Sequence, residues 1–370
     1  AFTALYADNM LKLAELLRNL EEELDKEEIE LAQEMEELLD TITGKIDYNS
    51  VSEKHELLGQ YFASCESKIS GEKTTVAISD LINDLETKAQ WIKEHIRENE
   101  LIENKDGYQW YNAYYDNNAQ RLEGDYPSGV RMTLTGQVFT IMSGVATAEQ
   151  IEKITTTADH YLKDETVGGY RLNTDFDEIK LDMGRAFGFA FGEKENGAMF
   201  SHMAMMYSNA LYQRSFASKG FEVINSVYEH CKDFSTSRIY PGIPEYIDSR
   251  GRGLYHYLTG SASWLLLTMV NQVYGVQGQV GDLKLAPQLV KSQFDEDNQA
   301  AVTAVFADRD LKINYHNPEL KSAAAYQVED IKLNGEEIDF DLENRAAIID
   351  RDLITNLDQN KEHQLEITLN

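Results

Sequence analysis

The sequence predicts a mainly α-helical protein that ends in a small antiparallel β domain. Up to residue 277, long stretches place apolar residues at helical spacing, and modest loops separate them. Residues 278–370 instead show alternating apolar positions between turns rich in Asn, Asp and Gly. We therefore expect a helical domain over residues 1–277 and a β domain over residues 278–370. Paired antiparallel helices of this kind are typical of an α/α architecture.

The first hundred residues predict four helices. We place them at Ala1–Leu20, Glu21–Thr43, Val51–Ile69 and Thr75–Ile96. In the second, 11 of the 20 residues from Glu21 to Asp40 are acidic, which indicates a solvated face rather than a function. In the third, the apolar spacing predicts four side chains that face inward, namely Leu57, Leu58, Tyr61 and Phe62.

The middle of the chain alternates short elements with loops. The aromatic segment Gly107–Asn118 predicts a strand and a hairpin between helices. Thr133–Ser143 predicts a short helix that Gly144 ends. A helix from Thr147 to about Leu162 follows, because Thr-Ala-Glu-Gln at its start resembles a capping box. The remaining segments here are a polar loop at Gly168–Thr174 and a helix at Gly220–Cys231.

The stretch Phe191–His202 combines charged residues, two glycines and a histidine before an apolar helix. Asn196 is a good N-cap, and Gly197 permits close approach to the backbone. From Ala198 the spacing predicts a helix with Met199, Met203, Met206 and Ala210 on one face, and with His202 and Asn209 along its flank. An isolated histidine in such a place is more often a hydrogen-bonded core residue than a ligand-binding one.

A second candidate site follows the arginine-containing loop Ser235–Leu258, which includes Arg252. An almost wholly apolar helix begins after Thr259 and runs to about Tyr274, so we expect it to be buried. Its first backbone N–H groups then need partners, and the hydroxyls of Thr259 and Ser261 could help them bind an anion. Alternatively, Thr259 simply caps the helix.

Composition narrows the class of protein. The net charge of −30 argues against nucleic acids and anionic membranes as partners. No apolar run approaches the roughly 20 residues that span a bilayer, and the first residues lack the basic segment of a secretory leader. Cys65 and Cys231 form neither a disulfide framework nor a metal motif, so we expect reduced thiols in a cytoplasmic protein. No phosphate-binding glycine loop, nucleophile elbow or histidine pair for a metal is present.

Two sequence blocks resemble those of a known enzyme family. Residues 195–202 resemble the ENG-x-x-F-x-H block of glycoside hydrolase family 94, the inverting glycoside phosphorylases. Residues 258–264 resemble the TGSAxW block of the same family, and the order, the spacing and the later change to a β domain agree. Residues 171–174 and 185–188 are similar to the branch that acts on β-1,2-linked glucooligosaccharides.

The resemblance implies that this chain holds the later helices of an (α/α)6 barrel and the last β domain. The implied enzyme cleaves β-linked glucooligosaccharides with inorganic phosphate and releases α-glucose 1-phosphate. The family's general acid is an aspartate in a DWND-like block, and none of the three tryptophans here, Trp91, Trp110 and Trp264, has such flanks. We therefore expect the acid upstream, in a part of the protein that this chain does not include.

The resemblance also assigns site residues. It implies that His202, Thr259 and Gly260 bind the phosphate. It also implies that Glu195 and Asn196 form hydrogen bonds with the sugar hydroxyls. Arg185 and Arg252 are candidates for added positive charge, or else members of structural ion pairs. Phosphate is a substrate that attacks as an anion and needs no general base, so one acid suffices. No cofactor and no metal are implied.

Other functions remain open at this point. The same fold also serves an inverting hydrolase or the phosphorylase-like domain of a cyclic glucan synthase. A different class is a non-catalytic module that binds glycans or acts as a scaffold. Expected partners are the oligosaccharide, phosphate and the preceding part of the same protein, and a second copy of the chain is a further candidate.

Overall fold

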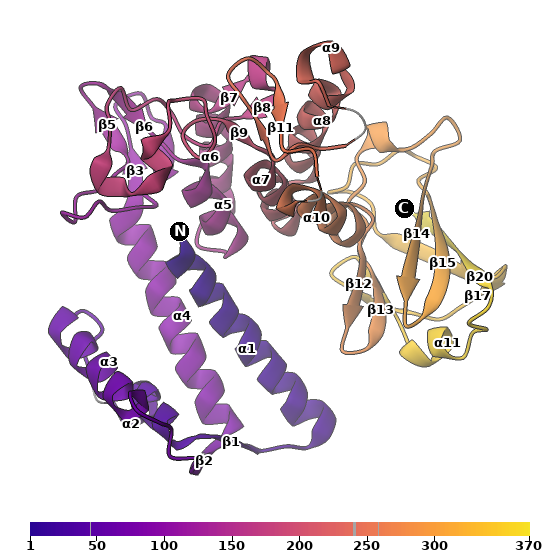
Figure 1. The fold of residues 1–370 in the computed structure, drawn as a ribbon. Helices are drawn as coiled ribbons and strands as arrows, with labels where there is room; N and C mark the ends of the chain where they lie inside the picture. Colours follow the sequence, from indigo (N-terminus) through magenta and orange to yellow (C-terminus); the bar gives the residue numbers. More distant parts are fainter. Residues whose placement is uncertain (45, 240–241, 258) are drawn as a thin grey trace. The chain divides into compact units, whose positions relative to one another are not determined.

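The structure is a computed structural model that describes residues 1–44, 46–239, 242–257 and 259–370. Leu258, which belongs to the predicted second block, lies outside the described residues. The chain divides into two compact units (Figure 1). The first comprises residues 1–100 and 143–145, and the second comprises residues 101–142 and 146–370.

The first unit is built on a pair of long helices. Helix α1 (Phe2–Leu24) lies alongside α4 (Ile78–Glu100), as Figure 1 shows. Small buried residues of α1 let the two helices approach closely; they are Ala4, Ala7 and Ala14. Between the helices in sequence come short elements: β1 (Glu28–Ala32), a 3₁₀ turn (Gln33–Leu38), α2 (Asp40–Thr43), α3 (Val51–Cys65) and β2 (Lys73–Ala77).

The predicted acidic helix over Glu21–Thr43 is wrong. Helix α1 ends at Leu24 because Asp25 adopts a left-handed conformation, with φ of 50°. Residues 28–32 then alternate between exposed and half-buried positions and pair in antiparallel register with β2. Ile29 and Leu31 both pack against the core of this unit, because side chains two residues apart lie on the same face of a strand. This packing outweighs the preference of the neighbouring glutamates for a helix.

The inward face predicted for the third helix is also only partly present. Leu57 of α3 is buried, whereas Leu58 is 44% and Phe62 is 63% exposed. The main packing partner of α3 is the short 3₁₀ turn at Gln33–Leu38. Such a small partner covers a narrow stripe of the helix, which leaves the rest of the apolar face in solvent.

The second unit begins with helices and small sheets. The helices are α5 (Leu134–Met142), α6 (Ala148–Tyr161), α7 (Ser201–Gln213), α8 (Ala217–Lys232), α9 (Phe234–Ser237) and α10 (Gly260–Leu267). Helix α7 is central, since it packs against α5, α8 and α10 and buries every residue from Met203 to Tyr212. The predicted capping box of α6 is confirmed: Gln150 N–H donates to Thr147 Oγ1 at 3.3 Å, and Thr147 N–H donates to Gln150 Oε1 at 2.9 Å.

Short strands fix the loops around these helices. The antiparallel pairs are β3 (Leu101–Glu103) with β4 (Gln109–Tyr111), β5 (Gly124–Tyr126) with β6 (Gly129–Arg131), and β7 (Lys163–Asp164) with β8 (Gly169–Tyr170). A three-stranded sheet has the order β11–β10–β9, formed by β9 (Met199–Phe200), β10 (Tyr246–Ile247) and β11 (Gly253–Leu254). The strand predicted in Gly107–Asn118 is therefore present as β4.

The apolar helix predicted from Thr259 to Tyr274 differs in two ways. It is α10 followed by a π-helical turn at Thr268–Val273, and it is not buried on all sides. Leu266 is 62% and Leu267 is 47% exposed. The principal packing partner of α10 is α7, which covers one side of the helix only.

The β region follows the π-helical turn and contains two sheets. The first has the order β12–β13–β19–β18 and the second the order β14–β15–β20–β16–β17. Their strands are β12 (Val276–Gln279), β13 (Asp282–Leu285), β14 (Gln299–Phe306), β15 (Arg309–His316), β16 (Val328–Leu333), β17 (Glu336–Glu337), β18 (Asp341–Glu343), β19 (Ala346–Ile349) and β20 (Glu362–Leu369), with helix α11 (Arg351–Thr355) before β20.

The prediction of a wholly antiparallel β domain is wrong at one pair of strands. Strand β20 runs parallel to β15 and antiparallel to β16, because it inserts between them after α11. The core between the sheets also includes Tyr212 and Ala217 from the helical region. The second unit thus combines helices and small sheets around shared apolar contacts. None of the described helices is both long enough and apolar enough to cross a lipid bilayer.

Candidate functional site

The N-terminal ends of α7 and α10 meet at His202 and Gly260. His202 is the second residue of α7, and Gly260 is the first of α10. A Cβ atom placed on Gly260 would lie 2.4 Å from His202 Cε1 and 2.5 Å from its Nδ1. The imidazole therefore packs directly on the Gly260 backbone, which only glycine permits. Two residues 58 positions apart in sequence are thus adjacent in space.

Thr259 caps α10. Its backbone is extended, and its Oγ1 accepts a hydrogen bond from Ser261 N–H at 3.2 Å. The alternative that Thr259 caps the helix, which the sequence also predicted, is therefore confirmed. Because the cap uses the hydroxyl as an acceptor, its own O–H remains available to donate to an anion.

A carboxylate, Glu245, lies beside this helix end. Ser261 Oγ donates to Glu245 Oε2 at 3.1 Å, and Glu245 accepts Ser201 N–H at 2.9 Å through its backbone carbonyl. One residue thus contacts the first turn of both helices. Sequence reasoning missed it, because 64 acidic residues offer no signal for one of them.

His202 lies in a partly buried, aromatic environment. The ring centroids of Phe200 and Trp264 are 5.4 Å and 6.4 Å from that of His202. Burial lowers the pKa of His202, and the negative charge of Glu245 opposes this effect only in part. The ring is therefore neutral at pH 7 and presents one N–H donor and one acceptor.

The loop before α7 contains Glu195 and Asn196, but Asn196 is not the N-cap of that helix. Residues 199–200 form β9 with β10, so α7 begins at Ser201 instead of Ala198. Asn196 Oδ1 accepts from Asn173 Nδ2 at 3.0 Å, and Asn196 Nδ2 donates to the Phe189 carbonyl at 2.8 Å. Its amide thus holds the loop together.

Glu195 presents a carboxylate oxygen that the protein leaves unused. Arg185 Nη2 lies 3.6 Å from Glu195 Oε1, and the arginine side chain is 75% exposed. Glu195 Oε2 is buried and has no hydrogen-bond partner among the described residues. A buried oxygen without a partner costs free energy, so it is suited to accept a hydrogen bond from a ligand hydroxyl.

Arg252 is not brought into this site by its contacts. Its backbone N–H donates to Asp248 Oδ1 at 3.0 Å in the turn between β10 and β11, and its side chain is exposed. Arg171 has the more direct role, because its Nη1 donates to the Gly197 carbonyl at 2.8 Å and its Nε donates to Asp164 Oδ2 at 2.8 Å. This arginine therefore supports the loop that carries Glu195.

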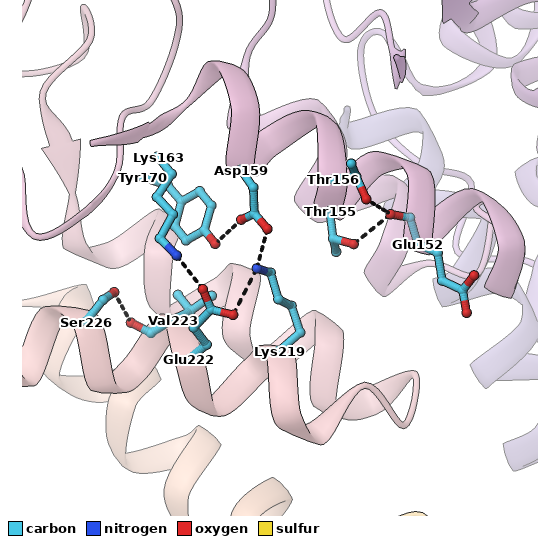
Figure 2. Close-up of polar contacts among 10 residues, drawn as sticks. All are labelled: Glu152, Thr155, Thr156, Asp159, Lys163, Tyr170, Lys219, Glu222, Val223 and Ser226. Carbon is cyan, nitrogen blue, oxygen red and sulfur yellow. Dashed lines mark hydrogen bonds and ion pairs between the residues drawn. The ribbon is translucent and has the colours of Figure 1, made fainter. Parts of the chain in front are cut away.

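A polar network fixes the strand that leads into Arg171 (Figure 2). Tyr170 Oη donates to Asp159 Oδ1 at 2.5 Å, and Lys219 Nζ bonds to Asp159 Oδ2 at 2.5 Å and to Glu222 Oε2 at 3.0 Å. Lys163 Nζ completes the network on Glu222 Oε1. It joins β7 and β8 to α6 and α8. Arg171, directly after β8, bridges to Met199, so the network also positions the entry to α7.

A fully buried carboxylate, Glu123, lies in the same unit and was not predicted. Its two oxygens accept backbone N–H groups of Ala113 and Thr133. Burial raises the pKa of Glu123 to about 8, although these hydrogen bonds favour the charged form. No group of three or more His, Cys, Asp or Glu side chains suited to a metal ion is present in the described ranges.

Comparison with known proteins finds related glycoside phosphorylases. The chain is 25% identical to cellobionic acid phosphorylase of Neurospora crassa over 205 residues. This matched stretch makes up 52% of this chain and 25% of that protein. It is 22% identical to solabiose phosphorylase of Paenibacillus borealis over 190 residues, which are 48% of this chain and 24% of that protein. A 3-O-β-D-glucopyranosyl-β-D-glucuronide phosphorylase from the same bacterium is 24% identical over 187 residues, again covering 48% and 24%. The chain thus spans about a quarter of the length of these relatives.

A family model identifies the region that contains the site. The glycosyl hydrolase 94 superfamily catalytic domain matches residues 69–275, more than half of the chain. The match includes the loop of Glu195, the start of α7 and the whole of α10. The chain therefore belongs to the glycosyl hydrolase 94 superfamily, and residues 69–275 match its catalytic domain.

Proposed function

We propose that this chain is the phosphate-binding and sugar-binding part of an inverting glycoside phosphorylase. The contact between His202 and the first residue of α10 carries the proposal. It joins an imidazole, a threonine hydroxyl and a helix N-terminus at one point. These are the groups that bind an oxyanion in a protein whose net charge is −30.

In the proposed reaction, the main task of these residues is to bind phosphate. Phosphate arrives as an anion and attacks the anomeric carbon on the face opposite the leaving oxygen, so no general base is required. His202, Thr259 and the Gly260 N–H would hold it there through hydrogen bonds. Since His202 is neutral, its share is one N–H bond rather than an ion pair.

On the sugar side, Glu195 has the clearest role. Its unpaired Oε2 would accept a hydroxyl proton of the bound glucosyl unit, and Asn196 would shape the loop that presents it. Arg185 would compensate the Glu195 charge from the solvent side. Arg252 is retained as a weaker candidate that would have to approach when substrate binds.

The remaining parts of the reaction rest on the family resemblance. The general acid would be an aspartate that precedes this chain in the full protein, and the helices would belong to an (α/α)6 barrel completed by that part. The preferred substrate would be a β-1,2-linked glucooligosaccharide, as residues 171–174 and 185–188 suggest by their similarity to that branch.

The test uses the full-length protein with β-linked glucose disaccharides, sophorose first, and inorganic phosphate. We expect phosphate-dependent release of α-glucose 1-phosphate. His202→Ala and Thr259→Ala should each lower kcat/KM for phosphate by about 10²-fold, the usual effect of removing one preorganised donor. A matched control is Thr156→Ala, because the exposed Thr156 hydroxyl donates to the Glu152 carbonyl of its own helix.

Two results would contradict the proposal. Glucose released equally fast without phosphate would indicate a hydrolase. No turnover of any β-linked disaccharide, with sugar binding unchanged in both variants, would indicate a non-catalytic glycan-binding module.

A further inference from the structure

Two residues near Glu195 have an unusual backbone. Lys194 and Tyr255 are not glycines, yet their φ angles are 50° and 62°. Lys194 occupies a tight turn in which Asn196 N–H donates to the Glu193 carbonyl at 3.1 Å, and such turns accept this conformation. A bulky aromatic residue rarely adopts it, and strained residues of this kind cluster at ligand-binding sites.

The two strained residues contact each other. Lys194 Nζ lies 5.7 Å from the centroid of the Tyr255 ring and 5.1 Å from that of Phe189. Both distances are within the range of a cation–π interaction. The turn that presents Glu195 is therefore connected, through Lys194, to the segment just after β11.

Tyr255 also belongs to a row of aromatic rings that starts beside His202. Phe200 stacks on Tyr246 with centroids 4.6 Å apart, and Tyr246 meets Tyr255 edge-on at 6.0 Å. Tyr257 continues the row at 6.2 Å from Tyr255. The row thus leads from the proposed phosphate site toward solvent, where Tyr255 is 37% and Tyr257 is 66% exposed.

The charges of two carboxylates act on the inner part of this row. Burial raises the pKa of Tyr246 to about 12, and the charges of Glu195 and Glu245 add to the effect. Glu245 directly precedes Tyr246 in sequence, and Lys194, directly before Glu195, contacts the Tyr255 ring. Tyr255 lies next to Tyr246 on the outer side of the row. An aromatic face beside unpaired carboxylate oxygen is the combination that binds a pyranose ring, which has apolar C–H faces and a rim of hydroxyls.

We propose that Tyr255 forms the wall of a glucosyl subsite next to Glu195, and that Lys194 holds its ring in place. The inference rests on the proposed function and names the outer part of its substrate site. The apolar face of a neutral glucosyl unit packs on the Tyr255 ring, and Glu195 accepts from a hydroxyl of the same unit. The backbone strain at Tyr255 is retained because it aims the ring at this position.

The decisive variant is Tyr255→Asn in the full-length protein. Asparagine tolerates a left-handed backbone better than tyrosine, so the variant removes the ring without adding strain. We expect KM for the oligosaccharide to rise about tenfold, as for loss of one aromatic contact, with KM for phosphate unchanged and thermal stability not reduced. Tyr255→Phe should behave like the wild type, and Lys194→Met should show a smaller rise in the same KM.

A matched control is Tyr228 of α8, an exposed tyrosine with a lysine over its ring. Tyr228 is 58% exposed, and Lys232 Nζ lies 5.5 Å from the ring centroid. Tyr228→Ala should leave both KM values unchanged. A comparable rise in that variant would show that the effect is not specific to the subsite.

The outcomes separate this inference from the proposed function. If phosphorolysis occurs and Tyr255→Asn leaves the oligosaccharide KM unchanged, the subsite is wrong and the function stands. A loss of thermal stability together with equal rises in both KM values would reveal a structural role and also overturn it. If the wild type shows no phosphorolysis, calorimetric titration with sophorose decides, and equal affinity of wild type and Tyr255→Asn rejects the subsite.

Discussion

Gly260 lies so close to His202 that a single methyl group would displace the imidazole. Gly260→Ala places a Cβ 2.4 Å from His202 Cε1, while alanine is compatible with the first position of the helix. We therefore expect a stable protein whose kcat/KM for phosphate falls about tenfold or more, since the ring can no longer pack on the helix end. Phosphate-dependent kinetics of the full-length variant measure this.

The chain offers a control for the same substitution. Gly59 lies within α3, and a Cβ there would meet no atom within 4 Å. Gly59→Ala should raise the free energy of unfolding by about 0.5–1 kcal/mol and leave phosphate kinetics unchanged. Unchanged kinetics in Gly260→Ala would mean that His202 does not act from this position.

At the scale of elements, the polar network between α6, β7, β8 and α8 makes the free energy of unfolding depend on pH. Burial disfavours the charged form of Glu222, but the bonds from Lys163 and Lys219 outweigh it and lower its pKa. The stabilisation is therefore complete above the ordinary pKa of about 4.3 and is lost as pH falls through the lower pKa of the folded state. Partial exposure limits it to less than about 1 kcal/mol.

Glu222→Gln tests this network. The variant should be less stable than the wild type at pH 6, and the difference should shrink as pH falls from 5 to 3, measured by urea unfolding. Glu229→Gln, on the same helix, is the control, because the ion pair of Glu229 with Lys232 is exposed and 3.5 Å long. A pH-independent difference at Glu222 would show that the network is not electrostatic in origin.

The elements also show which features the sequence can predict. The capping box at Thr147 and Gln150 depends on residues three apart, and it was predicted correctly. The pairing of His202 with Gly260 was accessible through a family resemblance, since no local pattern connects them. By contrast, β1 requires a partner more than 40 residues away, and Glu245, Glu123 and Tyr255 acquire their roles through tertiary contacts alone.

At the scale of the whole molecule, the net negative charge of the chain affects the stability of the folded state. A net charge of −30 repels itself in the folded state more strongly than in an expanded chain. Raising NaCl from 10 mM to 300 mM shortens the screening length from about 30 Å to less than about 8 Å. We therefore expect the melting temperature to rise with salt, as measured by scanning calorimetry.

Choline chloride at the same ionic strength separates screening from specific ion binding. Both salts should raise the melting temperature equally if repulsion among carboxylates is the cause. A melting temperature that is constant or falls with salt would show that attractive ion pairs outweigh the repulsion.

The position of β20 determines when the β region can be completed. This strand lies between β15 and β16, so the sheet lacks its middle until residues 362–369 have been synthesised. During translation, β14 and β15 can form their hairpin, but β15 and β16 each retain an open edge. A ribosome that stops before residue 362 would release a chain in which β15 and β16 each have one open edge, and open strand edges are prone to aggregate. Pairing of β20 with both neighbours is thus the step that completes this sheet.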